Sequence, residues 1–269
     1  NYWLYDLIFS FAYVQEFDNH FSYNLGFRNW DQRAAGALFF QRNDQTNSPV
    51  PNLATNELTV TLRYVPHEQI IQGSRDRHTI PSKYPIYNLQ ITQALNGVLG
   101  GDDYRYTRFD ANIYKRFYMS QLGYADVTLL GSMITGKVPF PLLNIIPANQ
   151  SIAYNPDAYN KMYYLEFVSD HYVGLNFTQS FNGFFLNKVP LIKHLKWREY
   201  LSFKVVYGGV RDENDPAKTS GLYRFPAASN KTYGTYALGH TPYTEAGVGI
   251  GNIFKFLRFD LIRRFNYLN

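Results

Sequence analysis

The sequence predicts an all-β protein whose strands form a transmembrane antiparallel β-barrel. Aromatic residues make up 18% of the chain, with 24 Tyr and 21 Phe, while charged residues make up only 17%. A soluble domain carries about 25% charged residues. Several segments alternate between apolar and polar side chains, and no apolar run approaches the ~18 residues of a membrane helix. Composition alone equally fits a soluble all-β protein rich in aromatic residues, so that alternative stays open.

The cysteine content and the net charge argue against certain kinds of site and partner. The chain has no cysteine, which excludes a disulfide framework and a thiolate metal site. Its net charge of +5 is spread along the strand-like segments rather than gathered on one face, so we expect no nucleic-acid partner. An exported barrel needs a signal peptide, whereas Asn1 begins directly in strand-like sequence. We therefore expect residues 1–269 to form one barrel domain of a processed or partial chain.

The first half of the chain is expected to supply six strands. Their predicted bounds are Leu4–Val14, Phe21–Arg28, Ala34–Arg42, Glu57–Val65, Pro85–Leu95 and Tyr104–Tyr118. The clearest signal lies in Glu57–Val65, where apolar residues occupy every second position. A short polar turn near Asp31 is expected to separate the second strand from the third, and Pro66–Tyr84 is predicted to be an irregular, charged link.

The second half is expected to supply five more strands. Their predicted bounds are Tyr124–Ile134, Met162–Phe181, Trp197–Val210, Tyr243–Gly251 and Phe256–Tyr267. The amphipathic segment NGFFLNKVPLIKHLK (182–196) is predicted to be a turn or a single helical turn at an interface. Bacterial single-chain barrels have even strand numbers. Since eleven is odd, we expect eleven to twelve strands from this chain and at least one closing strand beyond it.

The segment Gly136–Asn160, called the proline loop from here on, cannot be a regular strand or helix because it carries four prolines. It also carries Leu142, Leu143, Ile145 and Ile146, whereas disordered segments are poor in such residues. Residues 137–161 are therefore expected to fold inward into the barrel lumen. The candidate lumen-loop residues are Pro139, Phe140, Pro141, Leu142, Leu143, Asn144 and Asn149.

Connection lengths predict an orientation. Bacterial barrels have short periplasmic turns and long extracellular loops. If Arg211–Thr241 is extracellular, strand alternation also puts the proline loop and the polar loop 41–56 outside, and the turns at Gln121 and Asp31 inside. The link Pro66–Tyr84 is long for the periplasmic side.

The sequence contains no catalytic, cofactor-binding or metal-binding constellation. Its six histidines are scattered without the spacing of a metal site. Glu166 and Asp170 lie four residues apart on a predicted strand, about 13 Å, which is too far for paired acid–base chemistry. We expect them instead to pair with arginines in the lumen. The candidate lumen charges are Arg108, Asp110, Arg116, Glu166, Asp170, Arg258 and Asp260.

Four stretches carry a resemblance to a known family. They are SKYPIYNLQIT (82–92), GKVPFPLLNIIPANQSIAYN (136–155), the segment Tyr163–Glu199 that contains EFVSD and NGFFLNKVPL, and GIGNIFKFLRFDLIRRFNYL (249–268). They resemble the barrel of a large outer-membrane family of Bacteroidetes-type bacteria, whose members place a carboxypeptidase-regulatory-like domain before the barrel. The resemblance covers Glu57–Asn269 well and the earlier residues loosely.

That family is distantly similar to the outer-membrane assembly-factor superfamily, the sixteen-stranded barrel insertases and two-partner secretion pores. Counting back from a sixteenth strand puts the proline loop where that superfamily has its sixth extracellular loop, which folds into the lumen. Two features differ. PFPLLN (139–144) stands where the superfamily has an Arg-Gly-aromatic motif, and the first four strands are not in this chain.

The resemblance implies a non-enzymatic protein of the bacterial outer membrane. Its expected function is outer-membrane biogenesis, by insertion or translocation of protein or lipid-linked cargo. The alternative is a pore, or a structural accessory barrel docked to a nutrient-uptake or secretion complex. Expected partners are outer-membrane lipid and lipopolysaccharide, together with other outer-membrane or periplasmic proteins in a complex. A hydrolase is the third hypothesis, and no arrangement of catalytic residues in the sequence supports it.

Overall fold

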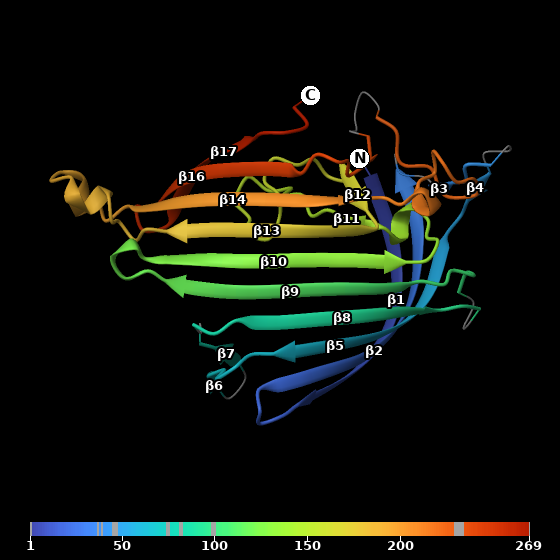
Figure 1. Cartoon of the computed structure of the whole chain (residues 1–269), viewed down its shortest axis with the longest axis horizontal. Helices are drawn as coiled ribbons and strands as arrows, with labels where there is room; N and C mark the ends of the chain where they lie inside the picture. The colour runs from blue at the N-terminus through green and yellow to red at the C-terminus, as the bar shows by residue number, and fades with distance from the viewer. Residues whose placement is uncertain are drawn as a thin grey trace.

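The computed structural model describes residues 2–36, 38, 40–44, 48–73, 76–80, 83–97, 101–228 and 234–268. Within these residues the protein is all-β, with short 3₁₀ turns and no α-helix. Ten long strands form a single antiparallel sheet, in which each strand pairs with the next sheet strand along the chain (Figure 1). They are β1 (Tyr2–Glu16), β2 (Phe21–Gly36), β5 (Leu53–Tyr64), β8 (Ile86–Leu95), β9 (Thr107–Tyr118), β10 (Tyr124–Thr135), β13 (His171–Ser180), β14 (Arg198–Gly209), β16 (Tyr243–Ile253) and β17 (Leu257–Arg264).

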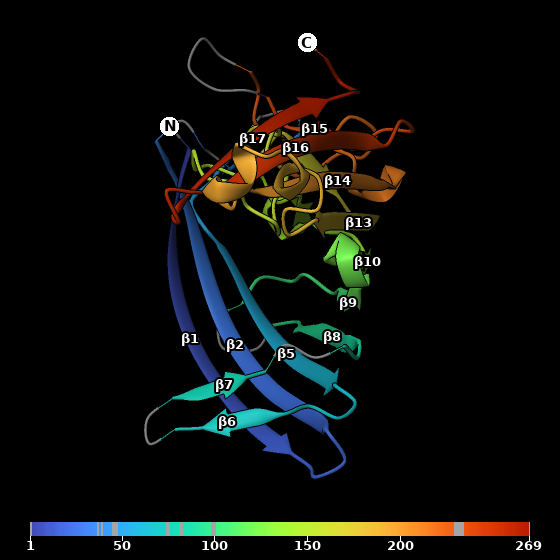
Figure 2. The same cartoon turned by 90° about the vertical axis from the view of Figure 1, so that its left-hand side faces the viewer.

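The sheet is strongly curved. Figure 2 shows it turning from β1 and β2 through β8, β9 and β10 to β16 and β17. Its edge strands are β1 and β17, which do not pair with each other in the described part of the chain, so the sheet is open there. No helix among the described residues is long and apolar enough to cross a membrane.

Seven further strands are short and lie outside the large sheet. β11 (Asn144–Ile145), β12 (Phe167–Ser169) and β15 (Tyr236–Ala237) form a three-stranded sheet, in which β12 pairs antiparallel with β11 and parallel with β15. β3 (Phe40–Gln41) pairs with β4 (Pro49–Val50), and β6 (Ile70–Gln72) pairs with β7 (Arg77–Thr79). The link predicted to be irregular at Pro66–Tyr84 therefore contains the β6–β7 hairpin.

The predicted third strand and the turn near Asp31 are wrong. β2 continues without a break from Phe21 to Gly36 and pairs with β1 over its whole length. Asp31 looked like a turn residue because it is polar, but its carboxylate accepts a hydrogen bond from Asn52 Nδ2 (2.8 Å) within the fold. The segment expected to end at Arg42 supplies only the end of β2 and the two residues of β3. The large sheet consequently has ten strands and not eleven.

The predicted strand Met162–Phe181 is also interrupted. It begins only at Phe167, and β12 and β13 are separated at Asp170, whose backbone N–H donates to Gly209 O (2.9 Å). Leu165 has a positive φ of 59°, which ends the extended conformation before β12. The other predicted strands coincide with strands of the sheet. The three long connections predicted to share one end of the sheet do so, and the tight turn at Gln121 lies at the other.

The two faces of the sheet differ in an unusual way. One face, called the inner face, carries polar side chains that are buried, among them Asn176 (6% exposed), Lys204 (1%) and Glu245 (2%). The opposite, outer face carries apolar side chains that are exposed, for example Val173 (56%), Val248 (56%) and Leu261 (77%). Strand alternation sends neighbouring residues to opposite faces, so this distribution follows directly from the period-two pattern.

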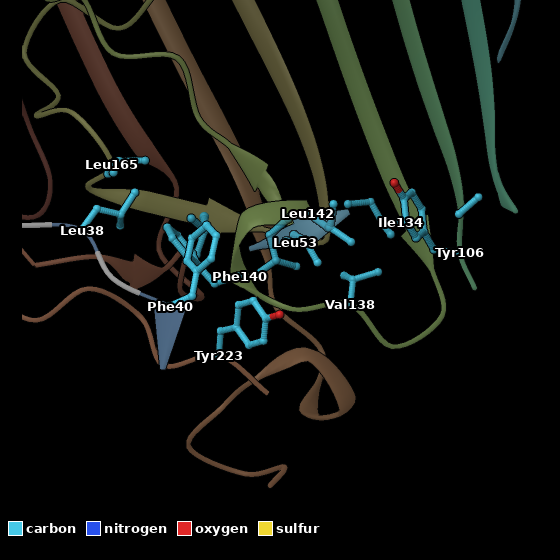
Figure 3. Packing of buried hydrophobic residues seen from close by; sticks show 13 residues of the cluster. Leu38, Phe40, Leu53, Tyr106, Ile134, Val138, Phe140, Leu142, Leu165 and Tyr223 are labelled. Carbon is cyan, nitrogen blue, oxygen red and sulfur yellow. The ribbon is translucent and has the colours of Figure 1, made fainter. Parts of the chain in front are cut away.

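The main hydrophobic core lies at the end of the sheet where the long connections gather. Side chains from the proline loop meet others from the sheet and from the connections before β5 and after β14 (Figure 3). Phe40 stacks on Tyr223 with ring centroids 5.5 Å apart. The labelled members are Leu38, Phe40, Leu53, Tyr106, Ile134, Val138, Phe140, Leu142, Leu165 and Tyr223.

Candidate functional site

The candidate site is the proline loop and the inner face that it covers. The first half of the loop is packed into the core: Phe140 and Leu142 belong to the short 3₁₀ turn η2 (Phe140–Leu142) and are 4% and 1% exposed. The Arg108 guanidinium on β9 donates to the carbonyl of Leu142. Proline at positions 139 and 141 leaves fewer backbone donors to satisfy in this buried turn. The first half of the loop is therefore packed in the hydrophobic core, and the folding of residues 137–161 into a barrel lumen stays a prediction.

The seven candidate loop residues do not all lie equally deep. Pro139, Phe140, Leu142, Leu143 and Asn144 are buried, whereas Pro141 and Asn149 are half-buried. Asn149 stabilises the later part of the loop, because its side-chain amide donates hydrogen bonds to Ala153 O (2.6 Å) and Asn160 Oδ1 (2.8 Å). The lumen assignment of all seven stays a prediction.

Asp170 stabilises the start of the proline loop through a network of hydrogen bonds. Its carboxylate is fully buried and accepts hydrogen bonds from Asn214 Nδ2 (2.8 Å) and Arg211 Nε (3.0 Å), and it lies 2.6 Å from His171 Nδ1. Asn214 in turn accepts the backbone N–H of Val138 (2.8 Å). One carboxylate thus connects β13, the connection after β14 and the proline loop.

The hydrogen bonds to Asp170 determine its protonation. Burial alone would raise the pKa of the Asp170 carboxyl, but hydrogen bonds from Asn214, His171 and Arg211 outweigh it and lower the pKa below its ordinary value. The group is therefore an anion at neutral pH. The predicted pairing of Asp170 with an arginine is confirmed, with Arg211 as the partner.

Two buried charges on neighbouring strands hold the second half of the loop. Lys204 Nζ on β14 donates to the carbonyls of Asn155 and Ala158, each at 2.6 Å. Glu245 on β16 accepts the backbone N–H groups of Asn160 (2.8 Å) and Lys161 (3.0 Å). Lys204 thus binds backbone carbonyl oxygens, and Glu245 binds backbone N–H groups. Hydrogen bonds with a charged partner are stronger than those between two neutral groups.

The third anchor is an ion pair with the last strand. Glu166 accepts two hydrogen bonds from the Arg264 guanidinium on β17, at 2.7 and 3.0 Å, and the two side chains are only 8% and 10% exposed. The predicted arginine partner of Glu166 is thereby confirmed. Glu166 and Asp170 flank β12 and form ion pairs with different parts of the chain, Arg264 and Arg211.

The remaining candidate charges also face the inner side of the sheet. Asp110 accepts from Ser132 Oγ (2.6 Å), and Arg116 pairs with Asp126 (2.7 Å). The Arg258 guanidinium is bound by Asp260 (2.7 Å) and lies over the rings of Tyr154 (4.3 Å) and Tyr200 (4.0 Å).

The sequence reasoning missed four charged anchoring side chains: Lys204, Glu245, Arg211 and Arg264. Lys204 and Glu245 lie on the face of β14 and β16 where polar or small residues alternate with the apolar residues of the other face. A charged residue at such a position was the sequence feature that could have identified them.

A cavity of 1260 Å³ is lined both by the second half of the proline loop and by the inner face. Tyr154, Tyr200, Arg258 and Asn176 are among its lining residues. Asn176 is nearly buried, and its Oδ1 has no hydrogen-bond partner within the described residues. The lining also includes Ile152, Phe256 and Ile262, so the cavity presents apolar as well as polar groups. Among the described residues, no group of three histidine, aspartate or glutamate side chains is placed to hold a metal ion.

Comparison with known families finds a match over most of the chain. The C-terminal domain of a family of unknown function, DUF5686, matches residues 4–213. The chain belongs to this family. In this DUF5686 domain the match includes the proline loop, Asp170 and Arg211, and it also includes β1 and β2, where the resemblance to the barrel family is looser. Strands β16 and β17, which supply Glu245 and Arg264, lie beyond it. No curated protein matches the chain.

Proposed function

We propose that this domain is a transmembrane β-barrel of the bacterial outer membrane, with the inner face lining the lumen. The observation that carries the proposal is the inverted distribution of side chains over the sheet: Lys204 and Glu245 are buried, while Val173, Val248 and Leu261 are exposed. A sandwich in water would bury the apolar face instead. In a barrel the apolar band faces lipid and the lumen is polar.

The extent of the apolar face also supports a membrane. Soluble monomers rarely expose contiguous apolar patches above ~300–600 Å². Here large exposed apolar side chains occur on the outer face from β1 to β17, for example Phe9 (67%), Leu129 (45%) and Phe259 (65%). A membrane-spanning strand needs about 9–11 residues. Nine of the ten sheet strands have 10 to 16 residues, and β17 has 8.

Within that membrane protein the proline loop acts as a plug. Its first half is packed in the core, and its second half is held by Lys204, Glu245 and, just after the loop, Glu166 with Arg264. The resemblance to the assembly-factor superfamily, whose sixth loop also folds into the lumen, supports a non-enzymatic role in outer-membrane biogenesis. That role is insertion or translocation of protein or lipid-linked cargo, in contact with lipopolysaccharide and with other outer-membrane or periplasmic proteins. The assignment of a biogenesis role rests on this similarity of fold.

The second candidate function is a gated pore, or an accessory barrel in a nutrient-uptake or secretion complex. The cavity of 1260 Å³ under the proline loop favours it, because an open space beside a removable plug can become a passage. In this case a ligand or partner that binds the loop would control opening.

Single-channel recording in planar bilayers tests the plug. The intact protein is compared with a deletion of residues 138–155 and with K204Q/E245Q, which loosens the loop without removing core residues. The matched control is K137Q/K161Q, because both lysines are exposed. We expect a nearly closed intact channel and control, and a large steady conductance from both loop variants. Equal conductance from all four proteins contradicts the plug.

A second assay separates the two functions. Vesicles containing the intact protein are mixed with an unfolded outer-membrane barrel, and the rate at which that barrel becomes protease-resistant is measured. Acceleration over protein-free vesicles supports biogenesis. If the rate is unchanged while the loop variants conduct, the pore is favoured and biogenesis is rejected.

A further inference from the structure

A second feature lies at the opposite end of the sheet, where the tight turns are. The connection 181–197 contains the 3₁₀ turns η3 (Leu186–Lys188) and η4 (Ile192–Leu195) and extends beyond the strands, at the left of Figure 1. The turn 254–256 lies beside it, because Asn252 Nδ2 donates to Lys196 O (2.7 Å) and Arg198 pairs with Gly251. The two connections therefore form one continuous surface.

The connection 181–197 has a defined shape. The Glu199 carboxylate accepts the backbone N–H groups of Gly183 (2.9 Å) and Phe185 (3.1 Å). Phe185 contacts Phe181 with ring centroids 5.2 Å apart, and Lys188 Nζ lies 3.8 Å from the ring centroid of Phe184. Glu199 is the only carboxylate in 181–199, and these backbone contacts occupy it.

The exposed side of this surface combines apolar and cationic groups. Leu191 is 86% exposed, Phe254 79% and Phe256 78%. The same two connections carry exposed lysines that form no ion pair within the described residues. We call this surface the basic collar and define it as Lys188, Lys193, Lys196 and Lys255 with Leu191, Leu195, Phe254 and Phe256. The other end of the sheet differs, since Asp102, Asp103, Asp212 and Glu213 are exposed there.

We propose that the basic collar binds anionic phospholipid in the leaflet next to the tight turns. Large exposed apolar side chains beside lysines are the features of a segment that lies in the headgroup region, with its apolar groups at the acyl boundary. The ammonium groups then meet lipid phosphates, and each lysine near an anionic surface strengthens association about five-fold. In a bacterial barrel the short turns face the periplasm, so the lipid is phospholipid of the inner leaflet. The inference rests on the proposed membrane location.

Trp197, at the end of the connection, provides the test. In a W3F/W30F background it is the single tryptophan, because the chain has three. The protein is reconstituted in phosphatidylcholine vesicles containing phosphatidylglycerol, with either lipid brominated at equal mole fraction. We expect brominated phosphatidylglycerol to quench Trp197 at least about twice as strongly as brominated phosphatidylcholine.

The control variants isolate the lysines. K188Q/K193Q/K196Q/K255Q is expected to abolish the difference between the two brominated lipids. K137Q/K161Q/K218Q, which removes exposed lysines at the other end of the sheet, is expected to preserve it. Equal quenching by both lipids in the unaltered collar overturns the lipid preference.

A second reporter separates this proposal from the membrane barrel itself. In a background without native tryptophan, V248W carries the probe on the outer face in the middle of β16. If neither Trp197 nor the residue-248 probe is quenched by either lipid, the membrane location fails. If the residue-248 probe is quenched and Trp197 is instead accessible to aqueous iodide, the barrel stands but the collar faces water. The collar then serves a protein partner and the lipid proposal is overturned.

Discussion

Removing the buried arginine of the Glu166–Arg264 pair is expected to weaken the fold severely. R264M deletes both hydrogen bonds to Glu166, at 2.7 and 3.0 Å, and leaves a carboxylate that is 8% exposed without a counter-charge. Loss of one partner from a buried ion pair costs about 3–5 kcal/mol. The methionine side chain is of similar length, so the cavity contribution stays small.

The assay is urea unfolding in detergent micelles, followed by tryptophan fluorescence, with the free energy of unfolding as the readout. R263M is the matched control because Arg263 is the neighbouring residue on β17 and is exposed; we expect a change within about 0.5 kcal/mol. The double variant E166Q/R264M removes both charges and is expected to be more stable than the sum of the single variants predicts, by about 0.5–3 kcal/mol. If R264M behaves like R263M, the pair does not anchor the segment that follows the proline loop.

Three further expectations concern two other anchors and the tight turn at Gly123. Because the pKa of Asp170 is lowered in the folded protein, its contribution to stability is complete above the unfolded pKa of about 3.9 and is lost as the pH falls through the lower folded pKa. Acid unfolding of D170N, followed by fluorescence, is therefore expected to lack that part of the transition. An acid-unfolding profile identical to that of the unaltered protein contradicts this expectation. K204M leaves the carbonyls of Asn155 and Ala158 without their donor and is expected to speed limited proteolysis of residues 149–157 about ten-fold, whereas K161M at an exposed position is not. At Gly123 φ is 77° and an added Cβ would overlap the carbonyl oxygen of Ser180, so G123A is expected to cost more than about 1 kcal/mol in urea unfolding, while G26A, with no neighbour nearer than 3.7 Å, is expected to cost less.

The strands were predictable because alternation is a local property. Glu57–Val65 shows its period in the sequence, and all of it except Val65 falls within β5. The same reasoning failed at Asp31, because a polar residue inside a strand has the composition of a turn. It also failed at Leu165 and Asp170, where β12 is drawn away from β13 to join β11 and β15. These pairings depend on residues distant in the chain, which no local pattern encodes.

The site was predictable only in outline. Four prolines beside a run of leucine and isoleucine were enough to predict a loop that packs inward. Its partners were not, because Lys204 and Glu245 lie 49 and 85 residues from the backbone atoms they bind. Glu166 and Asp170 could be assigned arginine partners from charge alone, yet the choice of Arg264 and Arg211 required the three-dimensional structure.

The position of Glu166 has a consequence for the order of folding. Its partner Arg264 follows it by 98 residues, and Glu245, which binds the backbone at Asn160, comes 85 residues after that contact. Contacts between such distant residues form late because the intervening chain must first be ordered. The proline loop therefore cannot reach its final position until β14, β16 and β17 have joined the sheet. Until those strands have paired, the second half of the loop lacks the side chains that hold it on the inner face.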